Sequence, residues 1–146
     1  MREPTIADTE LLDLARRAAD AAYCPYSRFA VGAAVETDRG RFLGCNVENA
    51  SYGLAVCAER VAIFTAIAAG ARRITRLAVS CVGARESDPP ESRMPCGACR
   101  QVIAEFMSAD AEIAIDGAGI WRLHELMPQP FKLRDPDGQS PSAREA

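Results

Sequence analysis

The chain has 146 residues, of which 49% are hydrophobic and 25% charged, and its formal net charge is -3 with acidic and basic residues interspersed. This length and balance favour one globular domain, and the lack of a Lys/Arg-rich block argues against a nucleic-acid partner. The first ten residues are too polar for an export signal, and the apolar stretch 61–71 is too short to span a membrane, so we expect a cytoplasmic protein.

The first half of the chain predicts a helix, two strands and a second helix. Apolar residues recur with helical spacing over 6–22. Residues 29–36 and 41–47 have the composition of strands and are joined by a turn-rich segment. A second helix is expected over 57–69, and Gly70 follows it as a residue that suits a helix C-terminus.

The second half predicts one strand, a loop, a third helix and two short strands. The apolar run 77–82 is typical of a central, covered strand, and the polar segment 83–94 is expected to be a loop. A helix is predicted over 96–107. Residues 112–115 and 120–123 then form strands, and the short connection between them implies an antiparallel hairpin.

This order of elements predicts an α/β domain, with one mixed sheet and helices packed on it. We expect the domain to span residues 1–133. The polar, proline-containing residues 134–146 are expected to form a loose tail.

Three of the six cysteines stand at the predicted starts of helices. They are Cys57 and the pair Cys96 and Cys99, which are three residues apart and project to the same side. Three thiolate ligands leave one tetrahedral position of a zinc ion open to water, which is the arrangement of catalytic zinc. Arg60 is placed to donate hydrogen bonds to the coordinating sulfurs and to offset their negative charge.

Glu59 lies two residues after Cys57, so its carboxylate can reach the open position of a zinc site. There it can take a proton from water and deliver it to a nitrogen of the substrate. A cysteine-bound zinc with such a glutamate is the pattern of the zinc deaminases.

Two other kinds of protein use similar cysteine patterns. A structural zinc module for protein binding would need a fourth ligand, from among Cys24, Cys45, Cys81 and His124. Each of these cysteines also suits the role of a small buried residue, and His124 lies far along the chain, at the end of the last predicted strand. A redox protein would instead form a reversible disulfide between Cys96 and Cys99.

Two further stretches offer groups for a sugar and a base. Asn46 and Glu48 face the same way if their segment is extended, and an amide beside a carboxylate suits a sugar hydroxyl. An Asn-rich turn after a strand is the alternative. Phe29 can form the wall of a base pocket or belong to the core.

Taken together, these stretches resemble the cytidine deaminase family. The residues that carry the resemblance are Tyr26-Ser27, 29–34, 45–53, 57–60, 95–101, 125–128 and Phe131. The resemblance covers nearly the whole chain up to Phe131. It implies the three-layer fold of that family, with a mixed five-stranded sheet and helices on both faces.

The resemblance also implies a reaction and the residues for it. Zinc would be bound by Cys57, Cys96 and Cys99, with Glu59 as the proton shuttle. The residues expected to bind substrate are Phe29, Asn46, Glu48, Ala58 and Phe131, the last of which would reach a neighbouring subunit's site. The implied activity is hydrolytic deamination of cytidine and deoxycytidine in pyrimidine salvage, by a small homotetramer with its sites at subunit contacts.

Two related activities use similar motifs. A deaminase of a modified or antibiotic cytosine nucleoside, such as blasticidin S, would share the zinc motif, but the stretch 46–53 argues for ordinary nucleosides. Deaminases that edit polynucleotides resemble one another in placing a helix between the last two strands. This chain has only the short turn 116–119 there.

Overall fold

The computed structural model describes residues 2–134 and residue 136. The tail predicted over 134–146 therefore lies almost wholly outside the described residues. Within the described part, no helix is both long and apolar enough to cross a membrane.

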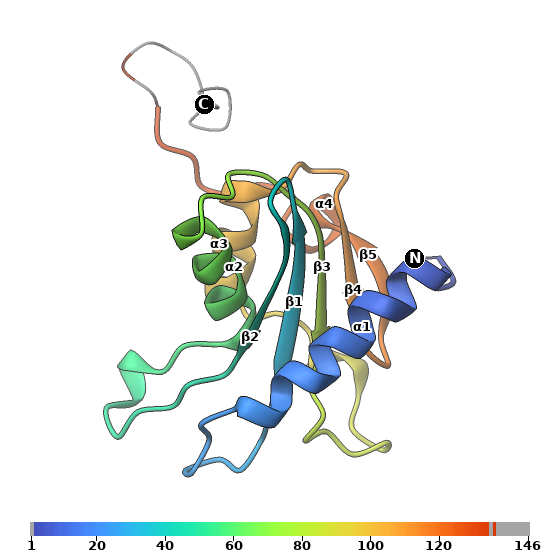
Figure 1. The fold of residues 1–146 in the computed structure, drawn as a ribbon, viewed down its shortest axis with the longest axis vertical. Coiled ribbons are helices and arrows are strands. Elements are labelled where there is room, and N and C mark those ends of the chain that lie inside the picture. The colour runs from blue at the N-terminus through green and yellow to red at the C-terminus, as the bar shows by residue number, and fades with distance from the viewer. Residues whose placement is uncertain (1, 135, 137–146) are drawn as a thin grey trace.

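One five-stranded mixed sheet forms the centre of the molecule, in the order β2-β1-β3-β4-β5 (Figure 1). The strands β3 and β4 are parallel, and all other neighbours are antiparallel. The strands are β1 (Gly32–Thr37), β2 (Gly40–Cys45), β3 (Ile74–Ser80), β4 (Glu112–Ile115) and β5 (Gly119–Arg122). The predicted central strand and the predicted C-terminal hairpin are both confirmed.

Helices cover both faces of this sheet, as expected. Figure 1 shows α1 (Ile6–Ala18) on one face and both α2 (Ala58–Ala68) and α3 (Gly97–Phe106) on the other. Successive side chains of a strand point to opposite faces, and the core divides accordingly. Ala34 and Ala78 pack against α1, whereas their neighbours in the strands pack in the larger cluster beneath α2 and α3.

Two glycines allow the helices to approach the sheet closely. A Cβ atom on Gly32 would lie 1.8 Å from the carbonyl oxygen of Ala15 in α1, and one on Gly44 would lie 2.2 Å from the backbone nitrogen of Ala62 in α2. No side chain fits at either position. The contact at Gly44 matters most for the site, because it sets the height of α2 above the sheet.

The structure corrects several sequence-based boundaries: the helix predicted over 6–22 ends at Ala18, the strand predicted over 41–47 ends at Cys45, and the strand predicted over 77–82 spans Ile74–Ser80. Two further corrections have a cause in the hydrogen bonding. The first strand begins at Gly32 rather than at residue 29, because the amide of Val31 bonds to the side chain of Asn46 instead of to a neighbouring strand. The predicted last strand, 120–123, ends at Arg122 and is followed by a helical turn, α4 (Leu123–Leu126), so the placement of His124 on a strand was wrong. The Glu125 carboxylate accepts a hydrogen bond from the Arg122 amide and so starts this turn.

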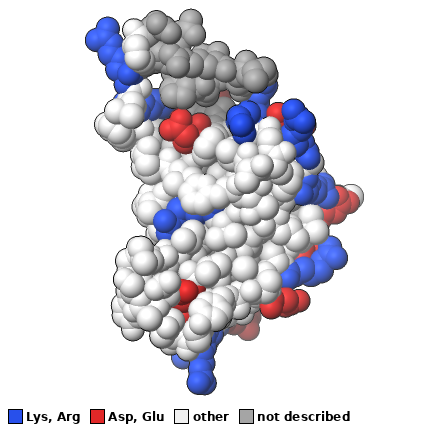
Figure 2. Space-filling model, turned by 60° about the vertical axis from the view of Figure 1, so that its left-hand side comes forward, with Lys and Arg blue, Asp and Glu red and all other residues white. Residues whose placement is uncertain are grey.

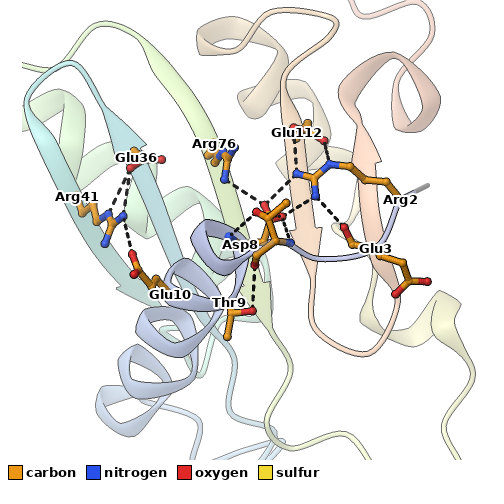
Figure 3. Close-up of polar contacts among 10 residues, drawn as sticks. Arg2, Glu3, Asp8, Thr9, Glu10, Glu36, Arg41, Arg76 and Glu112 are labelled. Carbon is orange, nitrogen blue, oxygen red and sulfur yellow. Dashed lines mark hydrogen bonds and ion pairs between the residues drawn. The ribbon is translucent and has the colours of Figure 1, made fainter.

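A buried carboxylate fixes the N-terminal segment to the sheet (Figure 3). Asp8 is only 2% exposed and forms ion pairs with Arg2 at 2.7 Å and with Arg76 of β3 at 3.2 Å. Arg2 also binds Glu112 of β4 at 2.6 Å. Burial acts to raise the pKa of Asp8, but hydrogen bonds from Arg2 and Thr5 outweigh burial and lower it to about 2.

Candidate active site

Three thiols meet where the N-termini of α2 and α3 come together. Cys57 is the N-cap residue of α2, Cys96 is that of α3, and Cys99 lies in the first turn of α3. The three Sγ atoms lie within 4.8 Å of one another, and those of Cys57 and Cys96 are 3.9 Å apart. Tetrahedral zinc with bonds of about 2.3 Å separates its sulfur ligands by about 3.8 Å. The cluster therefore fits a zinc ion.

The surroundings of the cluster stabilise negative charge on the sulfur of Cys57. Both helix N-termini direct their positive ends toward it. Arg60 donates a hydrogen bond from Nη2 to Cys57 Sγ at 3.5 Å. Hydrogen bonds from the Cys99 thiol and from Arg60 lower the pKa of Cys57 to about 5, against the opposing effect of burial. The same hydrogen bond to Cys57, together with burial, raises the pKa of Cys99, so the negative charge resides on Cys57. The Nε of Arg60 is buried without a partner among the described residues, so the guanidinium keeps a further donor inside the protein.

No fourth ligand joins this cluster in the part of the chain that the structure describes. Among the described residues the group contains three members, and Cys24, Cys45 and Cys81 are free thiols outside it. His124 lies apart on α4 and is half-exposed. A structural zinc site with four protein ligands is therefore not favoured, and one coordination position is left for water.

Glu59 follows Cys57 in the first turn of α2 and is only 4% exposed. Burial raises the pKa of its carboxyl to about 6. The side chain borders the cavity that also contains Cys57 and Cys96. A carboxyl group that is poised to gain or lose a proton near neutral pH, beside a metal site, is suited to general acid–base catalysis.

A cavity of about 250 Å³ opens beside the cluster. Its lining includes Phe29, Asn46, Glu48 and Ala58 together with Glu59. The structure thus brings four of the five predicted substrate-binding residues into one cavity, next to the sulfurs.

Asn46 and Glu48 also hold the segment that carries Phe29. Asn46 donates a hydrogen bond to the carbonyl of Phe29 at 2.8 Å and accepts one from the amide of Val31 at 2.9 Å. The Glu48 carboxylate accepts hydrogen bonds from the amides of Tyr26 and Ser27, both at 3.0 Å. Hydrogen bonds from Ser27 are the main reason that the pKa of Glu48 is lowered.

Phe131 is the predicted substrate-binding residue that the structure does not place in the cavity. Its backbone is held by Gln101 of α3, which donates to its carbonyl at 2.8 Å and accepts from its amide at 3.1 Å. The residue is 68% exposed. Gln101 therefore fixes the backbone of Phe131, whose side chain lies on the surface of the chain.

Sequence reasoning missed several residues of the cavity wall. They are Val31, Ala55, Val56, Val79, Cys81, Ser92, Arg93 and Met94. Some stand close in sequence to the site: Met94 directly precedes the Pro95-Cys96 pair, and Cys81 directly follows β3. This closeness in sequence to the predicted ligands and strand could have indicated that they line the cavity. The loop 83–94, however, has no periodicity that indicates which of its side chains point into the cavity.

Known proteins resemble this chain over most of its length. Residues 5–114 match the family model described as the cytidine and deoxycytidylate deaminase zinc-binding region. The chain is 46% identical to a cytidine deaminase of Mycobacterium tuberculosis over 123 residues, which cover 83% of this chain and 86% of the relative. It is 46% identical to a cytidine deaminase of Halalkalibacterium halodurans over 130 residues, which cover 86% of this chain and 94% of the relative. The crystal structure of cytidine deaminase from Burkholderia pseudomallei superposes with a TM-score of 0.74 at 42% identity, covering 84% of this chain and 98% of the other.

Proposed function

The chain belongs to the family of zinc-dependent cytidine and deoxycytidylate deaminases, and from this premise we propose that it hydrolyses cytidine and deoxycytidine to uridine and deoxyuridine, with release of ammonia. The observation that carries the proposal is the three-thiol cluster with buried Glu59 beside it, both bordering one cavity. We take residues 1–133 as the catalytic domain.

Cys57, Cys96 and Cys99 would hold the zinc ion. Zinc, when bound, lowers the pKa of a water molecule toward neutrality and so supplies a nucleophile at working pH. Arg60 and the two helix N-termini would partly neutralise the thiolates, which would preserve the Lewis acidity of a bound zinc ion.

Glu59 would move the protons of the reaction. Its carboxylate accepts a proton from water and delivers it to N3 of the cytosine ring, which makes C4 a better electrophile. After the resulting hydroxide has added to C4, the amine leaves as ammonia and the oxygen remains as the C4 carbonyl. The same carboxylate moves the second proton, from the new C4 hydroxyl to the departing amine. Its raised pKa suits both steps, because a group that titrates close to the working pH can both accept and donate a proton.

The other cavity residues would bind and orient the nucleoside. Phe29 offers an aromatic face to the base. Ala58 is fully buried and contributes a small side chain to the cavity wall. Asn46 and Glu48 would bind a sugar hydroxyl, since one nitrogen-bound hydrogen of Asn46 and part of the acceptor capacity of Glu48 remain unused.

The test is the loss of the cytidine absorbance band with purified, zinc-loaded protein, together with ammonia release. We expect wild type to deaminate cytidine and Glu59→Gln to be at least about 10²-fold slower at equal zinc content, because general acid–base catalysis is lost. Glu105→Gln, at an exposed position of α3, is the matched control and should behave as wild type. Zinc-loaded wild type that left both nucleosides unchanged would refute the assignment.

We also propose that the protein is a homotetramer in the cytoplasm, acting in pyrimidine salvage. Tyr52, Leu54, Phe64 and Phe131 are large exposed apolar residues. Figure 2 shows few charged side chains over the side of the molecule that carries α2 and the turn Tyr52–Leu54. A surface of this kind suits subunit contacts, across which Phe131 would reach a neighbouring site. The six free cysteines, three of them proposed ligands, suit a reducing compartment.

A further inference from the structure

The hydroxyl of Ser27 joins two residues of the proposed substrate site. Its Oγ donates a hydrogen bond to Glu48 Oε2 at 2.5 Å and accepts one from the amide of Phe29 at 3.0 Å. Phe29 and Glu48 line the cavity beside the thiol cluster, whereas Ser27 lines an adjoining cavity that shares Glu48 with it. The hydroxyl therefore links the backbone of Phe29 to the carboxylate of Glu48.

The turn that makes this contact is strained. Arg28 has a φ of 56°, and it is the one residue other than glycine with a positive φ in the described part of the chain. In this conformation the amide of Phe29 points back to the Ser27 hydroxyl, two residues earlier, and the amide of Arg28 donates to the carbonyl of Cys24 at 2.8 Å. Such a conformation persists where surrounding contacts determine it, and here Ser27 and Glu48 provide those contacts.

The acceptor sites of Glu48 are divided between its two oxygens. Oε1 accepts the amides of Tyr26 and Ser27, which uses its two lone pairs. Oε2 accepts the Ser27 hydroxyl alone, so one of its lone pairs remains free. The direction of this free lone pair depends on where Ser27 holds the carboxylate.

We propose that Ser27 is a positioning residue for sugar recognition: it aims Glu48 Oε2 at a nucleoside hydroxyl and ties that carboxylate to the backbone of Phe29. This role rests on the proposed function. Ser27 joins Glu48, which would contact the sugar, to Phe29, which would contact the base, so that both contacts belong to one rigid segment. The enzyme would thereby favour nucleosides over pyrimidines that lack the recognised hydroxyl.

The test compares wild type with Ser27→Ala and Ser27→Thr on deoxycytidine, 2′,3′-dideoxycytidine and 5′-deoxycytidine. For deoxycytidine we expect Ser27→Ala to raise KM about tenfold, with kcat within about twofold, because a hydrogen bond to a charged group is lost. On the analogue that lacks the hydroxyl bound by Glu48, the loss of kcat/KM should be at least about threefold smaller than on deoxycytidine, because only the contact of Ser27 with the backbone of Phe29 still acts there. Ser27→Thr, which keeps the hydroxyl, should remain within about threefold of wild type on all three.

An equal loss of kcat/KM on all three substrates, or no loss on any, would overturn the positioning role. Thermal unfolding of each variant checks the fold, and Ser27→Cys replaces Ser27→Ala if the latter does not fold. A second measurement needs no turnover: calorimetric binding of uridine and 2′,3′- or 5′-deoxygenated uridine to the same variants. Inactive wild type on cytidine would refute the proposed function, whereas equal weakening of all these ligands in Ser27→Ala would refute the role of Ser27 alone.

Discussion

The side-chain amide of Asn46 donates a hydrogen bond to the carbonyl oxygen of Phe29 at 2.8 Å. Its oxygen accepts one from the amide of Val31 at 2.9 Å, so a side chain pairs with the backbone just before β1 begins. Asn46 therefore builds the wall of the cavity that it also lines. Substrate binding and local stability should respond together when it is changed.

Asn46→Ala should lower the free energy of unfolding by about 1–3 kcal/mol, since two backbone groups lose their partner. KM for cytidine should rise as the Phe29 segment loosens. Urea unfolding and steady-state kinetics measure the two effects. The control is Asn49→Ala, which removes a hydrogen bond to Ser51 in an exposed turn and should cost less than about 0.5 kcal/mol. Equal effects of the two variants would contradict the role of Asn46.

The features that could be predicted from the sequence depend on signals within a few residues. Cys57 and Glu59 share the start of one helix, Cys96 and Cys99 share another, and the run that became β3 is apolar throughout. The features that could not be predicted depend on contacts between distant residues.

The missed features illustrate this dependence. The true start of β1 is set by the Asn46 side chain, 15 residues from Val31. Arg2 binds Glu112 across 110 residues of sequence. The helical turn at Leu123–Leu126 replaces a predicted strand end because Glu125 bonds to the Arg122 amide, a contact that strand composition does not reveal.

Cys96→Ser should abolish stoichiometric zinc binding at low micromolar zinc, because a hydroxyl is a much weaker zinc ligand than a thiolate. Activity should fall with zinc content. Chelation of wild type should give the same loss, reversed when zinc is restored. Metal analysis beside the deamination assay measures both. Cys24→Ser changes a free thiol outside the cluster and should retain both zinc and activity. Full zinc occupancy in Cys96→Ser would refute the assigned ligand set.

Gly44→Ala should destabilise the fold by about 1–3 kcal/mol or more, because the new methyl group would lie 2.2 Å from the backbone nitrogen of Ala62. The shift of α2 would also move Cys57 and Glu59, so zinc affinity should fall. Thermal unfolding and competition with a chelator measure these effects. At Gly53 a Cβ atom meets nothing within 4 Å, so Gly53→Ala is the control and should be close to neutral. If Gly44→Ala kept the stability and zinc affinity of wild type, the close contact between Gly44 and α2 would not be what positions Cys57 and Glu59.

Asp8 should make stability depend on pH in the acid range. Its pKa is about 2 in the folded protein against an ordinary value of 3.8, so the folded state binds the proton less readily than the unfolded state. The resulting stabilisation is fully present above about pH 4 and is lost as the pH falls toward 2; it amounts to on the order of 2 kcal/mol.

Urea unfolding at a series of pH values between 7 and 2.5 measures this dependence. Asp8→Asn should be less stable than wild type at pH 7, and the difference should shrink as the solution is acidified. Asp13→Asn removes an exposed carboxylate that pairs with Arg16 three residues away, and should leave the acid dependence nearly unchanged. A constant difference between Asp8→Asn and wild type at every pH would show that the ion pairs with Arg2 and Arg76 do not stabilise the fold.

Phe64→Glu should dissociate the proposed tetramer. Phe64 is exposed on α2, and a carboxylate placed in a closed apolar contact is strongly unfavourable. Sedimentation should then show a smaller species with an intact fold, and deamination should fall because Phe131 no longer reaches a neighbouring site. Ile6→Glu, at an exposed apolar position of α1 on the opposite face of the sheet, should leave the tetramer intact. A wild-type protein that sediments as a monomer with full activity would refute the shared site, since each cavity would then work without a neighbour.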